Sequence, residues 1–429
     1  MTKPRTIIIG IDGVPYKVME TLSEKGSMPN FKKLKEEGIF KKMHSSIPDI
    51  SSVAWSSVIT GTNSGEHGIF GFTDLVPGTY DIAFPNFTAL KAKPFWHQKP
   101  EKKYVIINVP STFPAQPLNG FLVSGFVSLD LQDSVYPQEF ISDLEKIGYK
   151  IDVDSAKGHT SKEEFIKDLF DTLRARVDAY RLFWDKFKWD VFMFVITGSD
   201  RIGHFLMDAF DDENQEYHTD FIEYFRKVDA AIGEITSKMN EDDSLIMLSD
   251  HGMETIDFNV YINAFLKEKG FLVLNEDSET ITYNNIAKGT RAFALDPGRI
   301  YVNLGGKYPQ GSVKPEDKNK VIAELVELFE NMEKDGKKII KSVNKKEDIF
   351  SGPLVEQGPD LVLLSNSGFN LRGSIAKDVV FEKDIFAGKH TQDDAFLFVK
   401  TKKNVKVPEI PKVSDIVSIM NQIDGDASD

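Results

Sequence analysis

The stretch that decides the fold is Thr6-Ile7-Ile8-Ile9-Gly10-Ile11-Asp12-Gly13, close to the N-terminus. A short apolar run that ends at an acidic residue and a glycine is typical of a buried strand followed by a turn. Similar runs recur along the chain. They lie at Tyr104–Val109, Val191–Ile196, Ser244–Leu248, 360–364 and 395–399. Together they predict a set of short buried strands.

Longer amphipathic patterns lie between these runs and predict helices. They cover residues 29–37, 161–188, 213–240 and 315–334. Strands separated by helices predict an α/β fold, with a mostly parallel sheet sandwiched by helices, in one domain that spans residues 1–429.

Two stretches interrupt the alternation of strands and helices. Residues 73–119 are rich in Pro, Phe and Lys, and residues 255–353 carry a helix and a lone strand-like run at 299–303. Ligands of open α/β sheets bind beyond the carboxyl ends of the strands. We therefore expect both stretches to be insertions that face the substrate.

The composition excludes several classes of function. The 429 residues carry a formal net charge of -14 and no cysteine. Disulfides and thiolate chemistry are therefore excluded, and the acidic surface disfavours a nucleic-acid polymer as partner. No run approaches the roughly 18 apolar residues of a membrane span. The N-terminal apolar run is too short for a signal peptide, so we expect a cytoplasmic protein that does not bind membranes.

Acids and histidines follow the predicted strands at several places. The candidates are Asp12, Asp200 with His204, Asp250 with His251, and His390. Taken singly, each is more easily explained as a cap, a turn or a solvated pair. If these strand ends converge on one edge of the sheet, the side chains supply the oxygen and nitrogen ligands that Zn²⁺ and Mn²⁺ prefer. Their joint occurrence predicts a metal centre.

A nucleophile candidate lies in the segment from Pro48 to Gly61. Ser51 and Ser52 stand directly before an apolar helical pattern that stops at Gly61. A hydroxyl at a helix N-terminus lies near free N–H groups and positive partial charge, which favour an alkoxide and bind a phosphoryl group. A serine that only caps the helix explains this segment better when the segment is taken alone, so the assignment of a nucleophile needs further support.

These motifs resemble the alkaline phosphatase superfamily, in its type I phosphodiesterase/nucleotide pyrophosphatase branch. Within that branch the sequence is most similar to the predicted phosphohydrolase/phosphomutase proteins of archaea and bacteria. The resemblance runs from Thr6 to about Gly425. It rests on the following residues: Asp12, the hydroxyl ahead of Thr60-Gly61, His67-Gly68-Ile69, Asp200-x-x-x-His204, Ser249-Asp250-His251-Gly252-Met253, Gly298 to Leu304, Gly388-x-His390 and Ser414-Asp415-Ile416.

The resemblance implies a role for each matching position. One divalent metal ion would be surrounded by Asp12, Ser51, Asp250 and His251, and a second would be held by Asp200, His204 and His390. The expected ions are Zn²⁺, with Mn²⁺ as the alternative. Register with Thr60-Gly61 places the catalytic nucleophile on Ser51, with Ser52 as the neighbouring alternative.

One departure from the family pattern concerns the substrate. In nucleotide pyrophosphatases an Asn shortly after the His-Gly-Ile turn helps to bind a phosphoryl oxygen, and the matching position here is Phe72. A nucleotide substrate is therefore not implied. The substrate-binding residues and the oligomeric state are not given by the sequence.

The implied activity is a two-metal phosphoesterase that hydrolyses a small phosphorylated substrate, a monoester or a diester, through a phosphoseryl intermediate. Alternatives on the same site are a phosphomutase and a non-catalytic protein that binds a phosphorylated ligand. A dinucleotide-binding oxidoreductase is disfavoured because the first turn lacks the full Gly-x-Gly-x-x-Gly. A sulfatase is disfavoured because Ser51-Ser52-Val53-Ala54 contains neither Pro nor Arg.

Overall fold

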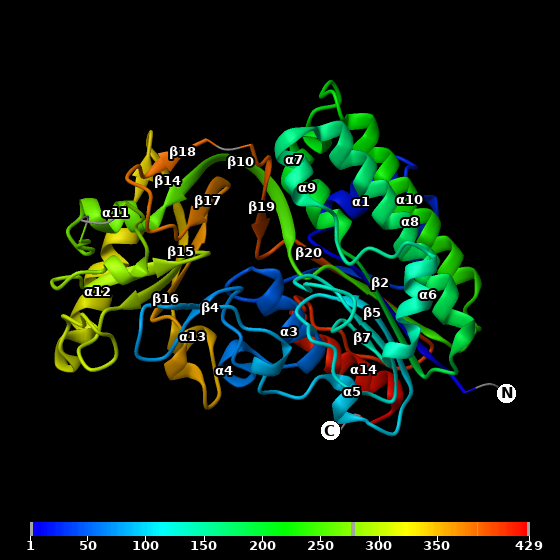
Figure 1. The fold of residues 1–429 in the computed structure, drawn as a ribbon. Coiled ribbons are helices and arrows are strands. Elements are labelled where there is room, and N and C mark those ends of the chain that lie inside the picture. The colour runs from blue at the N-terminus through cyan, green and yellow to red at the C-terminus, as the bar shows by residue number, and fades with distance from the viewer. Residues whose placement is uncertain (1–2, 276–278, 384, 427–429) are drawn as a thin grey trace. The chain divides into compact units, whose positions relative to one another are not determined.

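The computed structural model describes residues 3–275, 279–383 and 385–426, and its fold is drawn in Figure 1. The chain divides into two compact units. The first comprises residues 1–62, 86–254 and 385–429, and the second comprises residues 63–85 and 255–384. Of the stretch expected to be an insertion at 73–119, residues 73–85 thus belong to the second unit and residues 86–119 to the first.

The first unit is built on an eight-stranded sheet. Its five central strands, β9, β1, β8, β5 and β6, run parallel. Strands β20 and β7 run in the opposite direction, and β2, which pairs antiparallel with β20, runs in the same direction as the central five. In sheet order the strands are β2 (Ile39–Met43), β20 (Ala395–Lys400), β9 (Ser244–Leu248), β1 (Thr6–Ile11), β8 (Val191–Ile196), β5 (Tyr104–Val109), β6 (Gly120–Ser124) and β7 (Val135–Tyr136). The predicted mostly parallel sheet is confirmed.

Helices cover both faces of this sheet because alternate strand residues point to opposite sides. Ile7, Ile9 and Ile11 pack with residues of α1, α2, α8, α9 and α10, whereas Ile8 packs with residues of α3, α5 and α14. The helices of this unit are α1 (Tyr16–Glu24), α2 (Pro29–Lys35), α3 (Ser51–Thr60), α5 (Phe95–Gln98), α6 (Ile141–Lys146), α7 (Ser155–Thr160), α8 (Lys162–Lys186), α9 (Gly198–Asp211), α10 (His218–Ser237) and α14 (Ile416–Asp424).

The second unit has its own apolar core and its own antiparallel sheet, in the order β11-β12-β16-β15. Strand β10 runs across the boundary between the units and pairs with β17, β18 and β19. The elements are α4 (Ser64–His67), β3 (Asp74–Leu75), β4 (Ile82–Ala83), β10 (Gly252–Tyr261), α11 (Ile262–Glu268), β11 (Ala292–Leu295), β12 (Arg299–Val302), α12 (Lys318–Glu330), β13 (Glu333–Lys334), β14 (Lys337–Lys338), β15 (Ile340–Lys345), α13 (Lys346–Ile349), β16 (Leu361–Ser365), β17 (Gly368–Arg372) and β18 (Phe381–Glu382), with β19 (Gly388–Thr391) in the first unit.

Two sequence expectations about strands are corrected here. The run at 360–364 does form a strand, β16, but β16 pairs with β12 and β15 and not with the parallel sheet. The run at 299–303 is not a lone strand, because β12 pairs with β11 on one side and β16 on the other.

Among the described residues, each helix is too short or too polar to cross a lipid bilayer.

Candidate metal centre

The candidate ligands follow three neighbouring parallel strands of the first unit. Asp12 comes directly after β1, Asp250 and His251 come after β9, and Asp200 lies in the first turn of α9, which follows β8. Because β9, β1 and β8 are adjacent and parallel, their carboxyl ends meet at one edge of the sheet. The spacing of four positions from Asp200 to His204 places both side chains on the same face of α9.

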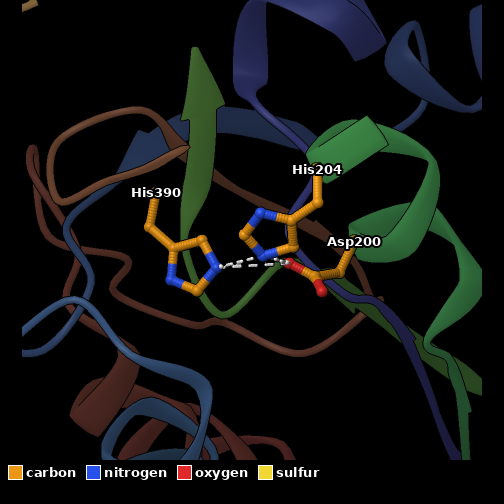
Figure 2. Close-up of side chains that lie close together, drawn as sticks. All are labelled: Asp200, His204 and His390. Atoms are coloured by element: carbon orange, nitrogen blue, oxygen red, sulfur yellow. Dashed lines mark hydrogen bonds and ion pairs between the residues drawn. The ribbon is translucent and has the colours of Figure 1, made fainter. Parts of the chain in front are cut away.

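Figure 2 shows the first group, in which Asp200, His204 and His390 point toward one another. His390 comes from β19 and brings its Nε2 atom to 3.0 Å from Nε2 of His204. Asp200 Oδ1 lies 3.3 Å from Nε2 of His390 and 3.4 Å from Nε2 of His204. Three ligand atoms, two from α9 and one from β19, therefore surround one point.

The second group consists of Asp12, Asp250 and His251, all of which are buried. His251 Nε2 lies 3.4 Å from Asp250 Oδ2 and 4.0 Å from Asp12 Oδ1. The two groups are neighbours, because the ring of His251 stacks on that of His390 at 3.6 Å and its Nε2 is 3.9 Å from Asp200 Oδ1.

All three imidazoles are oriented by the backbone. Nδ1 of His204 lies 3.0 Å from the carbonyl oxygen of Gly388, that of His251 lies 3.0 Å from Gly252 O, and that of His390 lies 2.9 Å from Asp49 O. A carbonyl oxygen only accepts, so each Nδ1 carries the proton. The Nε2 atoms are thereby turned toward the centre of the site, which is how metal-binding histidines are usually held.

The three carboxylates share a second pattern. One oxygen of each accepts a hydrogen bond: Asp12 Oδ2 from Trp55 Nε1 at 3.0 Å, Asp250 Oδ1 from the Gly13 amide at 3.0 Å, and Asp200 Oδ2 from Arg201 at 2.8 Å. The other oxygen of each is buried and accepts no hydrogen bond from the described residues. Buried anionic oxygens of this kind are costly unless a cation binds them. Three carboxylates and three imidazoles therefore fit two divalent cations.

The pKa values of the candidate ligands also indicate a site that requires positive charge. Burial raises the pKa of Asp12 well above its usual value, and the nearby carboxylates of Asp250 and Asp200 raise it further. Burial would also raise the pKa of Asp200, but His204, His390 and Arg201 outweigh it and hold that pKa well below the usual range. Burial lowers the pKa of His204 to about 4. Closely spaced carboxylates thus compete for positive charge, which protons supply when no cation is bound.

Ser51 and Ser52 differ in what they contact. Helix α3 begins at Ser51, with Ile50 as N-cap, so neither serine caps the helix. Ser51 Oγ lies 3.1 Å from His251 Nε2, whereas Ser52 Oγ is buried without a hydrogen-bond partner among the described residues. The structure therefore places the hydroxyl of Ser51, and not that of Ser52, against a candidate ligand. The predicted end of the helix at Gly61 is confirmed, with a left-handed C-cap at φ 73°.

Three further basic side chains have structural partners. Arg299 is buried and donates to the backbone oxygens of Asp296 and Thr73. Arg291 forms an ion pair with Glu324. His67 is buried and accepts from the Ile69 amide at 3.1 Å.

Sequence reasoning missed two residues that hold ligands. Trp55, which the sequence left open between a substrate contact and helix packing, packs in the core, and its indole also donates to Asp12. Its spacing of four residues from Ser51 places it on the same face of α3, which is a signal the sequence carried. Arg201 directly follows Asp200 and binds its carboxylate. No pattern in the sequence marked that contact.

Comparison with known proteins identifies the family to which the chain belongs. The family model for type I phosphodiesterase / nucleotide pyrophosphatase matches residues 6–393. The chain therefore belongs to this family and is a hydrolase of the alkaline phosphatase superfamily, as its motifs indicated. A search of curated proteins gave no match.

Solved structures share the fold across nearly the whole chain. Phosphonoacetate hydrolase from Sinorhizobium meliloti 1021, in complex with phosphonoformate, has 16% sequence identity and a TM-score of 0.64, with 99% of this chain and 96% of that chain covered. Human ectonucleotide pyrophosphatase / phosphodiesterase 5 has 11% identity and a TM-score of 0.58, covering 99% and 96%. The murine protein has 13% identity and a TM-score of 0.53, covering 98% and 94%. These likenesses confirm the alkaline phosphatase-like fold.

Proposed function

We propose that this member of the family is a two-metal phosphoesterase, in which Ser51 attacks the phosphorus of a small phosphorylated substrate. The observation that carries the proposal is the arrangement of inward-facing donors. Three Nε2 atoms and three buried carboxylate oxygens lie in two groups, and the hydroxyl of Ser51 stands beside His251. The three carboxylate oxygens accept no hydrogen bond from the described residues.

Two divalent cations bound there would neutralise the carboxylates, lower the pKa of the Ser51 hydroxyl and stabilise charge on the phosphoryl oxygens. Asp12, Asp250 and His251, with Ser51, would hold one, and Asp200, His204 and His390 the other. Mixed carboxylate and imidazole ligands favour Zn²⁺, with Mn²⁺ as the alternative. A cytoplasmic location stays a prediction.

The residues of the chain supply the rest of the chemistry. The Ser51 oxygen forms a bond to phosphorus, and the leaving alcohol departs with the electron pair of the broken P–O bond and takes up a proton. Ser51 is the first residue of α3, so the amide N–H groups of the first helical turn lie near the nucleophile. These groups would donate hydrogen bonds to the phosphoryl oxygens. Water then attacks phosphorus and breaks its bond to the Ser51 oxygen, which takes up a proton; a monoester substrate thereby yields inorganic phosphate and a diester substrate yields a phosphomonoester.

A metal reconstitution experiment tests this proposal. Protein stripped by a chelator and titrated with Zn²⁺ or Mn²⁺ should cleave chromogenic phosphomonoesters or phosphodiesters, with activity reaching its plateau near two ions per chain. No activation by either metal on either class of ester would refute it. A phosphomutase would differ by returning the phosphoryl group to another position of the same substrate, so that neither a free alcohol nor inorganic phosphate accumulates.

Ligand variants test the site itself. His390→Ala and Asp250→Asn should each abolish turnover, because each removes a donor from one of the two groups. His218→Ala is a matched control: its Nδ1 bonds a backbone carbonyl, that of Ala209, but it lies in neither group. Full turnover in either ligand variant would mean that the six side chains lie together by chance.

The two stretches 73–119 and 255–353 are still predicted to supply surface that faces the substrate. Substitutions there that change substrate preference test this prediction.

A further inference from the structure

A guanidinium group lies directly behind the first ligand group. Arg201 Nη1 donates to Asp200 Oδ2 at 2.8 Å, while its Nε and Nη2 both donate to Asp152 Oδ2, at 3.0 and 2.7 Å. Both side chains of the Arg201–Asp152 pair are about 15% exposed (14% and 15%), and that of Asp200 is 5% exposed. The guanidinium therefore links two carboxylates in a largely buried setting.

The guanidinium is held on its other sides as well. Its Cζ atom lies 4.3 Å from the centre of the Phe126 ring, a cation–π contact. Asp152 accepts a further hydrogen bond from Thr197 Oγ1 at 3.2 Å, and Thr197 Oγ1 is 3.3 Å from Asn108 Nδ2. Asn108, Phe126 and Thr197 lie at or just beyond the ends of β5, β6 and β8, which are neighbours in the sheet. The ends of three sheet strands thus help to fix the position of Arg201.

This arrangement determines how Asp200 is presented. With Oδ2 bound to Arg201, the free oxygen Oδ1 is the one that faces the imidazoles. It lies 3.3 Å from Nε2 of His390, 3.4 Å from that of His204 and 3.9 Å from that of His251. A rotation of the carboxylate away from this orientation would break the bond to Arg201.

We propose that Arg201 and Asp152 are positioning residues for the metal centre: Arg201 fixes the orientation of Asp200, and Asp152 fixes Arg201 and neutralises its charge. The inference rests on the proposed two-metal function. Metal ligands depend on such outer partners, whose loss typically weakens metal affinity about 10- to 100-fold. A lysine is not equivalent, because one ammonium group lacks the planar fork that binds two carboxylates at once.

The competing explanation is a buried ion pair with a purely structural role. Removing Arg201 alone cannot separate the two, because it leaves Asp152 buried and unpaired. The double variant Asp152→Asn/Arg201→Met removes both charges together and keeps similar volumes, a change that buried pairs often tolerate. We therefore expect it to keep the fold and to remove the donor to Asp200.

The experiment measures metal affinity by chelator competition and the thermal unfolding of the metal-free protein. We expect Arg201→Lys and the double variant to bind the ion held by Asp200, His204 and His390 about 10- to 100-fold more weakly than the wild type. The metal-free double variant should unfold near the wild-type temperature. Arg181→Met/Glu234→Gln, which removes a surface ion pair of the same unit, should leave both readouts unchanged.

Wild-type affinity in both variants would overturn the inference and leave the two-metal function intact. Failure of the wild type itself to bind metal would overturn the proposed function, and the inference with it. If the double variant does not fold, Arg201→Lys decides, since it keeps the charge: wild-type affinity in that variant refutes the positioning role.

Discussion

The sharpest prediction concerns the two adjacent serines of α3. Ser51→Ala removes the oxygen that lies 3.1 Å from His251 Nε2, so no phosphoenzyme forms and turnover should fall by a factor on the order of 10³ or more. The cost in folding should be small. One hydrogen bond is worth about 1 kcal/mol, and alanine regains part of it because it is the better helix former.

Ser52→Ala should behave differently. The hydroxyl of Ser52 is buried and has no hydrogen-bond partner among the described residues, and it does not cap the helix. Removing an unpaired hydroxyl costs no hydrogen bond, so both turnover and stability should stay within about 1 kcal/mol of the wild type. The two substitutions are chemically identical and one position apart, so Ser52→Ala is the control for Ser51→Ala.

The assay combines turnover with trapping of the intermediate. Metal-loaded enzyme is mixed with a chromogenic ester, quenched in acid and digested, and the phosphorylated peptide is identified by mass spectrometry. We expect phosphate on Ser51, normal metal content in Ser51→Ala, and no label in that variant. Phosphate on Ser52, or full activity of Ser51→Ala, would refute the assignment.

Two further predictions concern buried aromatic rings near and away from the metal centre. Trp55→Phe removes the donor to Asp12 and should weaken metal affinity about 10- to 100-fold in a chelator competition, whereas Trp96→Phe, whose indole N–H has no partner among the described residues, should not. Burial lowers the pKa of His67 to about 3 from 6.5. Between these values the unfolded chain binds the proton and the folded chain does not, so stability is complete above pH 6.5 and falls by about 1.4 kcal/mol per unit as the pH drops toward 3. Urea unfolding of metal-free protein at pH 7 and 5 should show this slope, and His67→Asn, which keeps an acceptor for the loop amide, should reduce it; an equal slope in the variant would contradict the assignment.

The strands of the parallel sheet could be predicted closely because their local signal is strong. The runs at Thr6–Ile11, Tyr104–Val109, Val191–Ile196 and Ser244–Leu248 are strands with those bounds. Their residues are fully buried, so apolar side chains occupy the whole strand and polar residues mark both ends. An edge strand gives no such signal: β2 reads Ile39-Phe40-Lys41-Lys42-Met43 and is half exposed.

Pairing partners could not be predicted, because a run of apolar residues does not specify its neighbour. The run at 360–364 reads like a central parallel strand, yet β16 lies in the antiparallel sheet of the second unit. One local signal was available. Asp296-Pro297-Gly298, with Gly298 at φ 58°, is a turn sequence between β11 and β12 and marks them as a hairpin.

The ligand residues of the site could be proposed from the sequence because strand ends converge in a parallel sheet. Their supports could not. The carbonyl of Asp49, which orients His390, is 341 positions away in the chain, and a backbone oxygen has no residue-specific signature. Asp152 lies 49 positions from Arg201, in a loop with no pattern that points to α9. Contacts of this kind depend on tertiary structure alone.

The charges around the site also determine the order in which ligands bind. Three carboxylates dominate the ends of β1, β8 and β9, and the nearest cationic groups are already engaged: Arg201 is shared between Asp200 and Asp152, and Lys389 Nζ lies 2.7 Å from Glu254. A phosphate group that entered without metal would meet net negative charge in a setting of low dielectric constant. On the proposed two-metal function, bound cations would reverse that sign, so we expect metal binding to precede substrate binding.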